Sequence, residues 1–352
     1  MKRLVIAALA IAAMAACTKS NVQYEQPGEI SLQPVTQKAT KAAVDGTYYP
    51  TETAYNFNVW AWWADKNAGT ALAEFTSTTD YIAEGTFTAR NNVSWGGVTP
   101  YYWPTKGSLV FAGYSPASAK VEGTEFKYYL TAQGTAGEGG YIAPNTLRIT
   151  NFTQPIELEQ THDLMWFDVT DNSHNNNGTA GVPVTFKHAL SWLTFKFVLA
   201  DNITTHQWEI TDVKLQNVNT KGDFIATKSE GVINAGTWTL STNDTDKKVM
   251  TVYDTNTHIV STTPTKLEKA ENGVVVIPQE CVKLYIIYNL TASTGKKISQ
   301  DVTLDLATGI AEGKWLPGKH YIYTITFGAN EILIAPQVAD WEDVEVENIP
   351  VQ

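Results

Sequence analysis

The sequence predicts an all-β protein built of β-sandwiches. Short runs in which apolar and polar residues alternate recur along the whole chain of 352 residues. Gly, Pro and Asn separate these runs, and no segment sustains the helical period of 3.6. Because neighbouring side chains of a strand point to opposite faces, alternation indicates strands with one buried face. Many short strands with turn residues between them are typical of sandwiches.

The clearest strand signal lies in residues 182–199. Apolar residues hold even positions from Val182 to Trp192 and odd positions from Leu193 onward. A shift of one residue exchanges the two faces of a strand unless a bulge or bend absorbs it. We therefore expect two strands with a break at residues 188–192.

A polar run before this signal divides the chain into two halves. Residues 171–181 are rich in Asn and Gly, which is the composition of turns and linkers. The chain is long enough for two domains. We predict an N-terminal sandwich over residues 29–175 and a C-terminal sandwich over residues 182–352.

The first residues have the pattern of an export signal. Lys2 and Arg3 precede an apolar run, and small residues precede Cys17. The apolar run is shorter than the roughly 20 residues needed to span a bilayer, so residues 1–16 are interpreted as a cleaved signal peptide. The small-small-Cys ending resembles a bacterial lipobox, in which the cysteine carries lipid. Residues 17–28 would then be a tether to the outer membrane.

The next segment predicts a short strand. Ile30 and Leu32 share one face, and Pro34 argues against a central place in a sheet because it lacks a backbone N–H. A loop with two lysines, Lys38 and Lys41, follows among small residues. Exposed loops of this kind are preferred sites of proteolysis.

Residues 55–63 predict a central strand. Phe57, Val59 and Ala61 lie on one face, and Trp60 and Trp62 lie on the other. Since both faces are apolar, both should be covered.

The charge balance argues against nucleic acid as a partner. The net charge is −11, and it becomes −13 when Lys2 and Arg3 leave with the signal. No basic patch is available to neutralise phosphates. Besides Cys17 the chain has one cysteine, Cys281, so a lipidated Cys17 leaves no intrachain disulfide. We expect Cys281 to be a small buried apolar residue.

No catalytic, cofactor-binding or metal-binding pattern is present. The nucleophile elbow, the P-loop, the dinucleotide-binding glycines and the zinc motifs are all missing. The polar run around Asp168 and Asp171 lacks the spacing of a calcium loop and its closing Glu. The histidines are scattered, and we interpret them as structural: His162, His174, His188, His206, His258 and His320.

Aromatic residues support an alternative function. Trp60, Trp62, Tyr101, Tyr102 and Trp103 would form a platform for stacking sugars if several rings were exposed on one face. The chain would then be a monomeric surface lipoprotein that binds a glycan or host ligand. If the rings are buried, they are core residues instead.

Several ordered motifs resemble the fimbrillin-like lipoproteins of the Bacteroidales, which are subunits of type V pili. They span most of the chain: Cys17, the Ile30-Ser-Leu strand, Thr40-Lys-Ala, Phe57-Asn-Val-Trp-Ala, Tyr101-Tyr-Trp-Pro, Phe111-Ala-Gly-Tyr-Ser-Pro, Asp163-Leu-Met, Phe186-Lys-His-Ala-Leu-Ser, Val276-Ile-Pro-Gln, Trp315-Leu-Pro-Gly-Lys-His-Tyr-Ile-Tyr and Asp340-Trp-Glu-Asp.

The resemblance implies two transthyretin-like β-sandwich domains in tandem and an assembly mechanism. In that family a subunit is exported as a lipoprotein, and a trypsin-like protease removes the N-terminal segment with its first strand. A C-terminal strand of another subunit then fills the open groove by β-augmentation. The resemblance thus implies a lipid-anchored precursor at the outer membrane, partners among other pilus subunits, and a mature location in a surface fimbria that supports adhesion.

Carried onto this sequence, the resemblance assigns a role to specific residues. Ile30 and Leu32 mark the removable strand within residues 29–41, and the cut would fall between Lys41 and Ala42, or after Lys38. The donor strand would be residues 344–352, with its apolar side chains at Val344, Val346, Ile349 and Val351. A subunit that is not trimmed would remain an anchor, so the stalk, anchor and tip positions all stay open.

Overall fold

The computed structural model describes residues 28–36, 49, 51–65, 79–91, 94–167, 181–201, 206–229, 232–233, 236–269, 273–328 and 332–341. Within these ranges the chain is all-β, as predicted, and its helices are single 3₁₀ turns: η1 (Thr53–Tyr55), η3 (Ala117–Ala119), η4 (Leu158–Gln160), η5 (Asp244–Asp246) and η6 (Ala311–Gly313). No helix in the described residues has the length and apolar character needed to cross a membrane.

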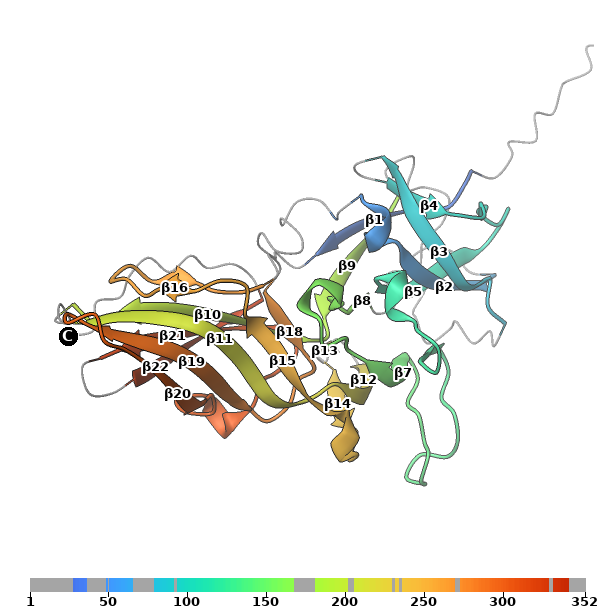
Figure 1. The fold of residues 1–352 in the computed structure, drawn as a ribbon. Coiled ribbons are helices and arrows are strands. Elements are labelled where there is room, and N and C mark those ends of the chain that lie inside the picture. Colours follow the sequence, from blue (N-terminus) through green and yellow to red (C-terminus); the bar gives the residue numbers. More distant parts are fainter. Residues whose placement is uncertain are drawn as a thin grey trace, which may run out of the picture.

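The first unit is a closed barrel, whereas the sequence predicts a β-sandwich. Its strand order is β1-β4-β3-β2-β5-β8-β9, and β9 returns to β1 to close it (Figure 1). The β1–β9 pair is parallel, and the other pairs of the barrel are antiparallel. Its strands are β1 (Ser31–Thr36), β2 (Phe57–Ala64), β3 (Ile82–Asn91), β4 (Ser94–Gly97), β5 (Ser108–Ser115), β8 (Met165–Phe167) and β9 (Val182–His188).

A separate sheet covers one side of this barrel and draws strands from both halves of the sequence. The central pair is β7 with β12, and β6, β13 and β14 extend it. The strands are β6 (Glu125–Tyr129), β7 (Thr146–Thr153), β12 (Lys221–Ser229), β13 (Val232–Ile233) and β14 (Thr237–Leu240).

The second unit is a sandwich of two sheets, drawn at the left of Figure 1. One sheet has the order β17-β10-β21-β22 with β18 beside β10, and the other has the order β15-β11-β19-β20 with β16 beside β11. The strands are β10 (Ser191–Leu199), β11 (His206–Asn219), β15 (Lys247–Tyr253), β16 (His258–Ile259), β17 (Thr265–Lys266), β18 (Val274–Val276), β19 (Lys283–Ala292), β20 (Lys297–Asp305), β21 (Lys319–Phe327) and β22 (Ile332–Asp340).

Strand pairing crosses the division that the sequence suggests at residues 175–182. β9 pairs with β1 and β8 in the barrel, although it follows the polar run. The predicted break at residues 188–192 is confirmed, since β9 ends at His188 and β10 begins at Ser191. Ala189 and Leu190 are fully buried where the chain passes from barrel to sandwich. The change of phase in the sequence therefore marks the place where the chain passes from the barrel to the sandwich.

Three hydrophobic clusters hold these layers together: the barrel interior, the layer between barrel and covering sheet, and the sandwich interior. β2 contributes to the first two, because Phe57, Val59 and Ala61 face the barrel interior while Trp60 and Trp62 face the covering sheet. The predicted central position of this strand is confirmed, since β3 and β5 flank it.

Candidate functional site

β1 completes the barrel by pairing on both of its edges. It pairs antiparallel with β4 through Ser31 and Leu32, and parallel with β9 from Leu32 to Thr36 (Figure 1). Its first residues are therefore not an edge strand, contrary to the expectation from Pro34. The proline is accommodated because it lies beyond the β4 pairing, where only β9 is a neighbour.

The residues before β1 are also paired. The Ile30 N–H donates to the Tyr101 carbonyl at 2.7 Å, and the Trp103 N–H donates to the Gly28 carbonyl at 3.0 Å. Arg90 Nη2 lies 2.9 Å from Glu29 Oε1, but both side chains are about two-fifths exposed, so the ion pair contributes little. Backbone hydrogen bonds and burial therefore stabilise this segment more than the ion pair does.

Side chains from Ile30 and from β1 fill the barrel interior. Ile30 and Leu32 have no exposed surface, and Pro34 is also buried. Burial of a large aliphatic side chain contributes about 1.5–3 kcal/mol. Removing this strand would leave apolar pockets and unpaired backbone groups along β4, β9 and residues 101–103.

Gly181 permits the close approach of β9 to β1. Its φ is +91°, a conformation that favours glycine. A Cβ at this position would lie 2.8 Å from the carbonyl carbon of Ser31. The parallel pair thus depends on a residue without a side chain.

The remaining residues that the sequence assigns to the site lie outside the described residues. These are Cys17, Lys38, Lys41 and Ala42, and the tail residues Val344, Val346, Ile349 and Val351. Their roles stay predictions. Of the assigned residues, Ile30 and Leu32 are placed, and both face the barrel core.

The start of the tail is fixed at the junction between barrel and sandwich. Trp341 follows β22 and is 4% exposed. Its ring stacks on His188, with centroids 4.2 Å apart, and its N–H donates to the Gly318 carbonyl at 2.9 Å. The described part of the chain therefore ends beside the last residue of β9.

Two histidines of this junction are held by structural contacts. His188 Nδ1 lies 2.8 Å from Asp163 Oδ1. His320 stacks on Trp192 with centroids 3.6 Å apart, and its Nε2 lies 3.0 Å from Thr194 Oγ1. Burial, aided by nearby Lys266 and Lys196, lowers the pKa of His320 to about 3. His320 is therefore neutral at physiological pH.

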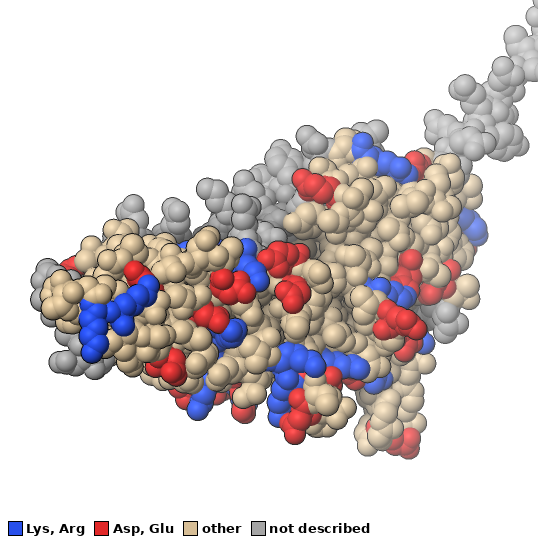
Figure 2. Space-filling view, in the orientation of Figure 1, with Lys and Arg blue, Asp and Glu red and all other residues tan. Residues whose placement is uncertain are grey.

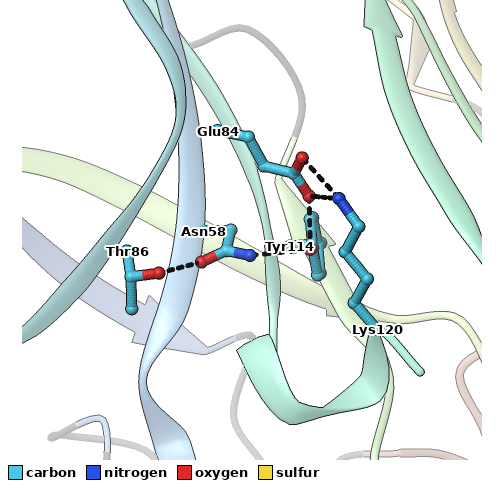
Figure 3. Close-up of polar contacts among 5 residues, drawn as sticks. All are labelled: Asn58, Glu84, Thr86, Tyr114 and Lys120. Atoms are coloured by element: carbon cyan, nitrogen blue, oxygen red, sulfur yellow. Dashed lines mark hydrogen bonds and ion pairs between the residues drawn. The ribbon is translucent and has the colours of Figure 1, made fainter. Parts of the chain in front are cut away.

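A polar network inside the first unit was not apparent from the sequence. Thr86 Oγ1 donates to Asn58 Oδ1, Asn58 Nδ2 donates to the Tyr114 hydroxyl, and that hydroxyl donates to Glu84 Oε1, each at 2.7 Å (Figure 3). Lys120 Nζ lies 2.6 Å from Glu84 Oε2. The network ties β2, β3 and β5 together and gives each polar group a partner. It contains no activated nucleophile, so we interpret it as structural.

The chain matches the family model described as fimbrillin-like over residues 40–341. The chain belongs to the fimbrillin-like family. No curated protein matches it. Within the described residues of this fimbrillin-like protein, no group of three or more metal-ligating side chains occurs.

The solved structures to which this chain is similar include proteins from Bacteroides and Porphyromonas species. A candidate cell adhesion protein from Bacteroides uniformis is 14% identical, with a TM-score of 0.48, covering 89% of this chain and 99% of its own. A fimbrial protein from Bacteroides vulgatus is 15% identical, with a TM-score of 0.47 and the same coverage. The tip fimbrial protein Mfa3 from Porphyromonas gingivalis, with a C-terminal truncation, is 12% identical, with a TM-score of 0.35, covering 89% and 100%.

The aromatic platform considered as an alternative is absent from this fimbrillin-like protein. Trp60, Trp62 and Trp103 are buried, and Tyr101 is partly buried against Phe87. Tyr102 alone of the five is mostly exposed. These rings pack in cores because a barrel with a covered face needs large apolar residues on both sides of β2. The surface in Figure 2 is mostly uncharged, with acidic and basic side chains interspersed.

Proposed function

We propose that this chain is a structural subunit of a surface pilus that assembles by donor-strand exchange. It is exported as a lipoprotein through Cys17, trimmed by a trypsin-like protease after Lys41, and joined to other subunits through its tail. Its two units are transthyretin-like in this proposal. The role is structural and supports adhesion, and no catalytic step is involved.

The main support is the position of β1. This first strand contributes fully buried side chains and closes the barrel between β4 and β9. Its loss would open a groove of extended shape with free backbone groups on both sides. A strand from another chain satisfies such a groove by adding main-chain hydrogen bonds and apolar side chains.

The proposed cut lies where it would separate β1 from the rest of the barrel. β1 ends at Thr36, and the next barrel strand, β2, begins at Phe57. Lys38 and Lys41 fall between them. Cleavage after either lysine would leave β1 attached only by noncovalent contacts, which a competing strand can replace.

The proposed donor follows β22. Residues 344–352 carry the apolar side chains Val344, Val346, Ile349 and Val351. Alternation at Val344 and Val346 matches the spacing of Ile30 and Leu32, so an extended tail can place two apolar side chains into the vacated pockets.

Trypsin treatment tests this proposal. A chain that begins at Thr18 should be cut once near Lys41 and should then form oligomers, detected by mass spectrometry and light scattering. Lys41→Gln should block the cut, whereas Lys38→Gln should leave it in place. A chain that ends at Trp341 should be cut but stay monomeric. If the trimmed full-length chain also stays monomeric, the stalk role is rejected.

The same experiment separates the possible positions in the pilus. A chain that is trimmed and polymerises is a stalk subunit, and a chain that resists trypsin at Lys41 keeps its lipid and acts as an anchor. Cys17→Ala should abolish membrane association of the precursor in the producing cell, which is measured by fractionation.

A further inference from the structure

A groove of about 1000 Å³ lies in the second half of the chain, away from β1. We name it the β11–β14 groove. Its walls are the end of β11, strand β14, residues 278–283 and residues 314–317. None of the functions described above uses it.

Lysines outnumber carboxylates in the lining of the groove by three to two, although the chain as a whole carries a net charge of −11. Lys247, Lys283 and Lys314 line it, against the carboxylates of Asp244 and Glu280. Lys247 Nζ lies 2.8 Å from Asp244 Oδ1. Lys283 and Lys314 are exposed and form no ion pair with another described residue. They are therefore available to an anionic ligand.

The groove also has apolar surface. Trp238 and Leu240 are half-buried in it, and Leu316 is 48% exposed. The Trp238 ring is fixed, because its Nε1 donates to the Ala189 carbonyl at 2.7 Å and its ring packs on Phe224. A ligand with both acidic and apolar side chains would match this surface.

The wall formed by the end of β11 is rigid. The Gln279 amide bonds both the N–H and the carbonyl of Asn219, at 2.8 and 3.1 Å. Just before it, Asn217 adopts a φ of +58° at a register shift of β11. Bulges of this kind redirect side chains, and Asn217 is exposed toward the groove. A rigid wall lowers the entropic cost of holding an extended chain.

The C-terminal tail begins beside this groove. Trp341 bonds to Gly318, and the two residues before Gly318, Leu316 and Pro317, line the groove. Residues 342–347 read Glu-Asp-Val-Glu-Val-Glu, so the segment carries four carboxylates, and from Asp343 onward they alternate with valines. Residues 342–352, which follow directly on Trp341, can extend about 36 Å.

We propose that residues 342–352 bind in the β11–β14 groove of their own chain before assembly. Their carboxylates would lie near Lys283 and Lys314, and Val344 and Val346 would cover Leu316 and Trp238. The smaller pocket at the junction is a poor alternative, because Glu159 and Asp163 line it and repel an acidic segment. If the tail is the donor strand, as proposed above, this contact keeps it from premature exchange. The docking itself does not depend on that role.

Cys281 provides a direct test, because it lines the groove and is the single cysteine of a chain that begins at Thr18. Val346→Cys should form an intramolecular disulfide with Cys281 under mild oxidation, since bridging requires Cα atoms within about 7 Å. Burial raises the pKa of the Cys281 thiol to about 11, which leaves it mostly protonated at neutral pH. The reaction is therefore run at pH 8.5, where the cysteine introduced in the tail supplies the reactive thiolate. The product is identified by peptide mapping of the monomer.

Charge variants decide whether the groove holds the tail. Lys283→Glu with Lys314→Glu should lower the yield of the disulfide about tenfold, and 0.5 M salt should have a similar effect. Lys127→Glu with Lys296→Glu makes the same charge change at exposed lysines outside the groove and should leave the yield unchanged. Circular dichroism confirms that both double variants are folded.

Three outcomes would overturn the proposal: no disulfide, a disulfide only between two chains, or equal yields in the two double variants. Its failure can be told apart from failure of the pilus proposal. If the disulfide does not form but the chain still polymerises after trypsin, the donor-strand role stands and the docking is rejected. If the disulfide forms but the chain never polymerises, the docking stands and the pilus proposal is rejected.

Discussion

Trp341 and His188 stack face to face, with ring centroids 4.2 Å apart and ring planes 3° apart. His188 is the last residue of β9, and β9 is the parallel partner of β1. β1 pairs with residues 182–186 of β9, and Trp341 stacks on the last residue of the same strand. β9 therefore contacts both the strand that closes the barrel and the residue that precedes the proposed donor segment.

Trp341→Ala should destabilise the protein by about 3 kcal/mol, the lower part of the range for a buried Trp, because the residue lies just beyond the last described strand. Urea unfolding measures this loss. Trp341→Phe keeps a ring against His188 and should lose less. Equal losses for the two variants would mean that stacking is not what fixes the tail.

Leu32→Ala should cost about 2–5 kcal/mol, because the side chain is fully buried in the barrel interior. Gln33→Ala, at the next position of β1, is the matched control and should change the unfolding free energy by less than about 0.5 kcal/mol. A small effect of Leu32→Ala would show that β1 adds little to the barrel, and the groove left by its removal would then bind a donor weakly.

Tyr114→Phe should cost about 1–3 kcal/mol, because the hydroxyl has polar partners on both sides, Asn58 and Glu84. Burial and the nearby Glu84 raise the pKa of Tyr114 far above its usual value, so the hydroxyl remains a donor at any physiological pH. Tyr102→Phe, at a mostly exposed ring, should be neutral in the same urea titration.

Stability should fall on acidification partly through His320. Its pKa is about 3 in the folded chain and about 6.5 when unfolded, so only the unfolded state binds the proton between these values. The contribution of neutral His320 to the free energy of unfolding is fully present above pH 6.5. Below that pH it falls by up to about 1.4 kcal/mol per pH unit. From pH 7 to pH 4 the unfolding free energy of the wild type should therefore fall more steeply than that of His320→Gln. Parallel curves would refute this assignment.

The sequence predicted the elements with a local signal. Alternation located β9 and β10, and two apolar faces placed β2 at the centre of its sheet. The parallel pairing of β1 with β9 has no such signal, because it joins strands at opposite ends of the first unit. The polar run before β9 indicated a domain boundary, but polar composition marks a loop and does not say which sheet the next strand joins.

The candidate site was predicted in part, because only some of its residues carry a local signal in the sequence. Ile30 and Leu32 were found because they alternate, and both are buried as an inserted strand requires. The roles of Glu84 and Lys120 were missed because these residues look like ordinary surface charges, and only the fold brings them to Tyr114. Cys281, expected to be buried, is partly exposed in the groove wall because residues 278–283 form that wall.

Cleavage near Lys41 should not by itself release β1. The cut peptide would keep its pairing with β4 and β9 and its two fully buried side chains, Ile30 and Leu32. Native mass spectrometry of the trypsin-treated chain that ends at Trp341 should therefore show both fragments as one complex. A synthetic peptide of residues 342–352 should displace the cut peptide, because it offers main-chain hydrogen bonds and apolar side chains to the same groove. The same peptide with Val344→Asp and Val346→Asp is the control and should not displace it, since each carboxylate would be buried without a partner. Immediate loss of the cut peptide without any competitor would show that the covalent link, rather than packing, holds β1 in the barrel.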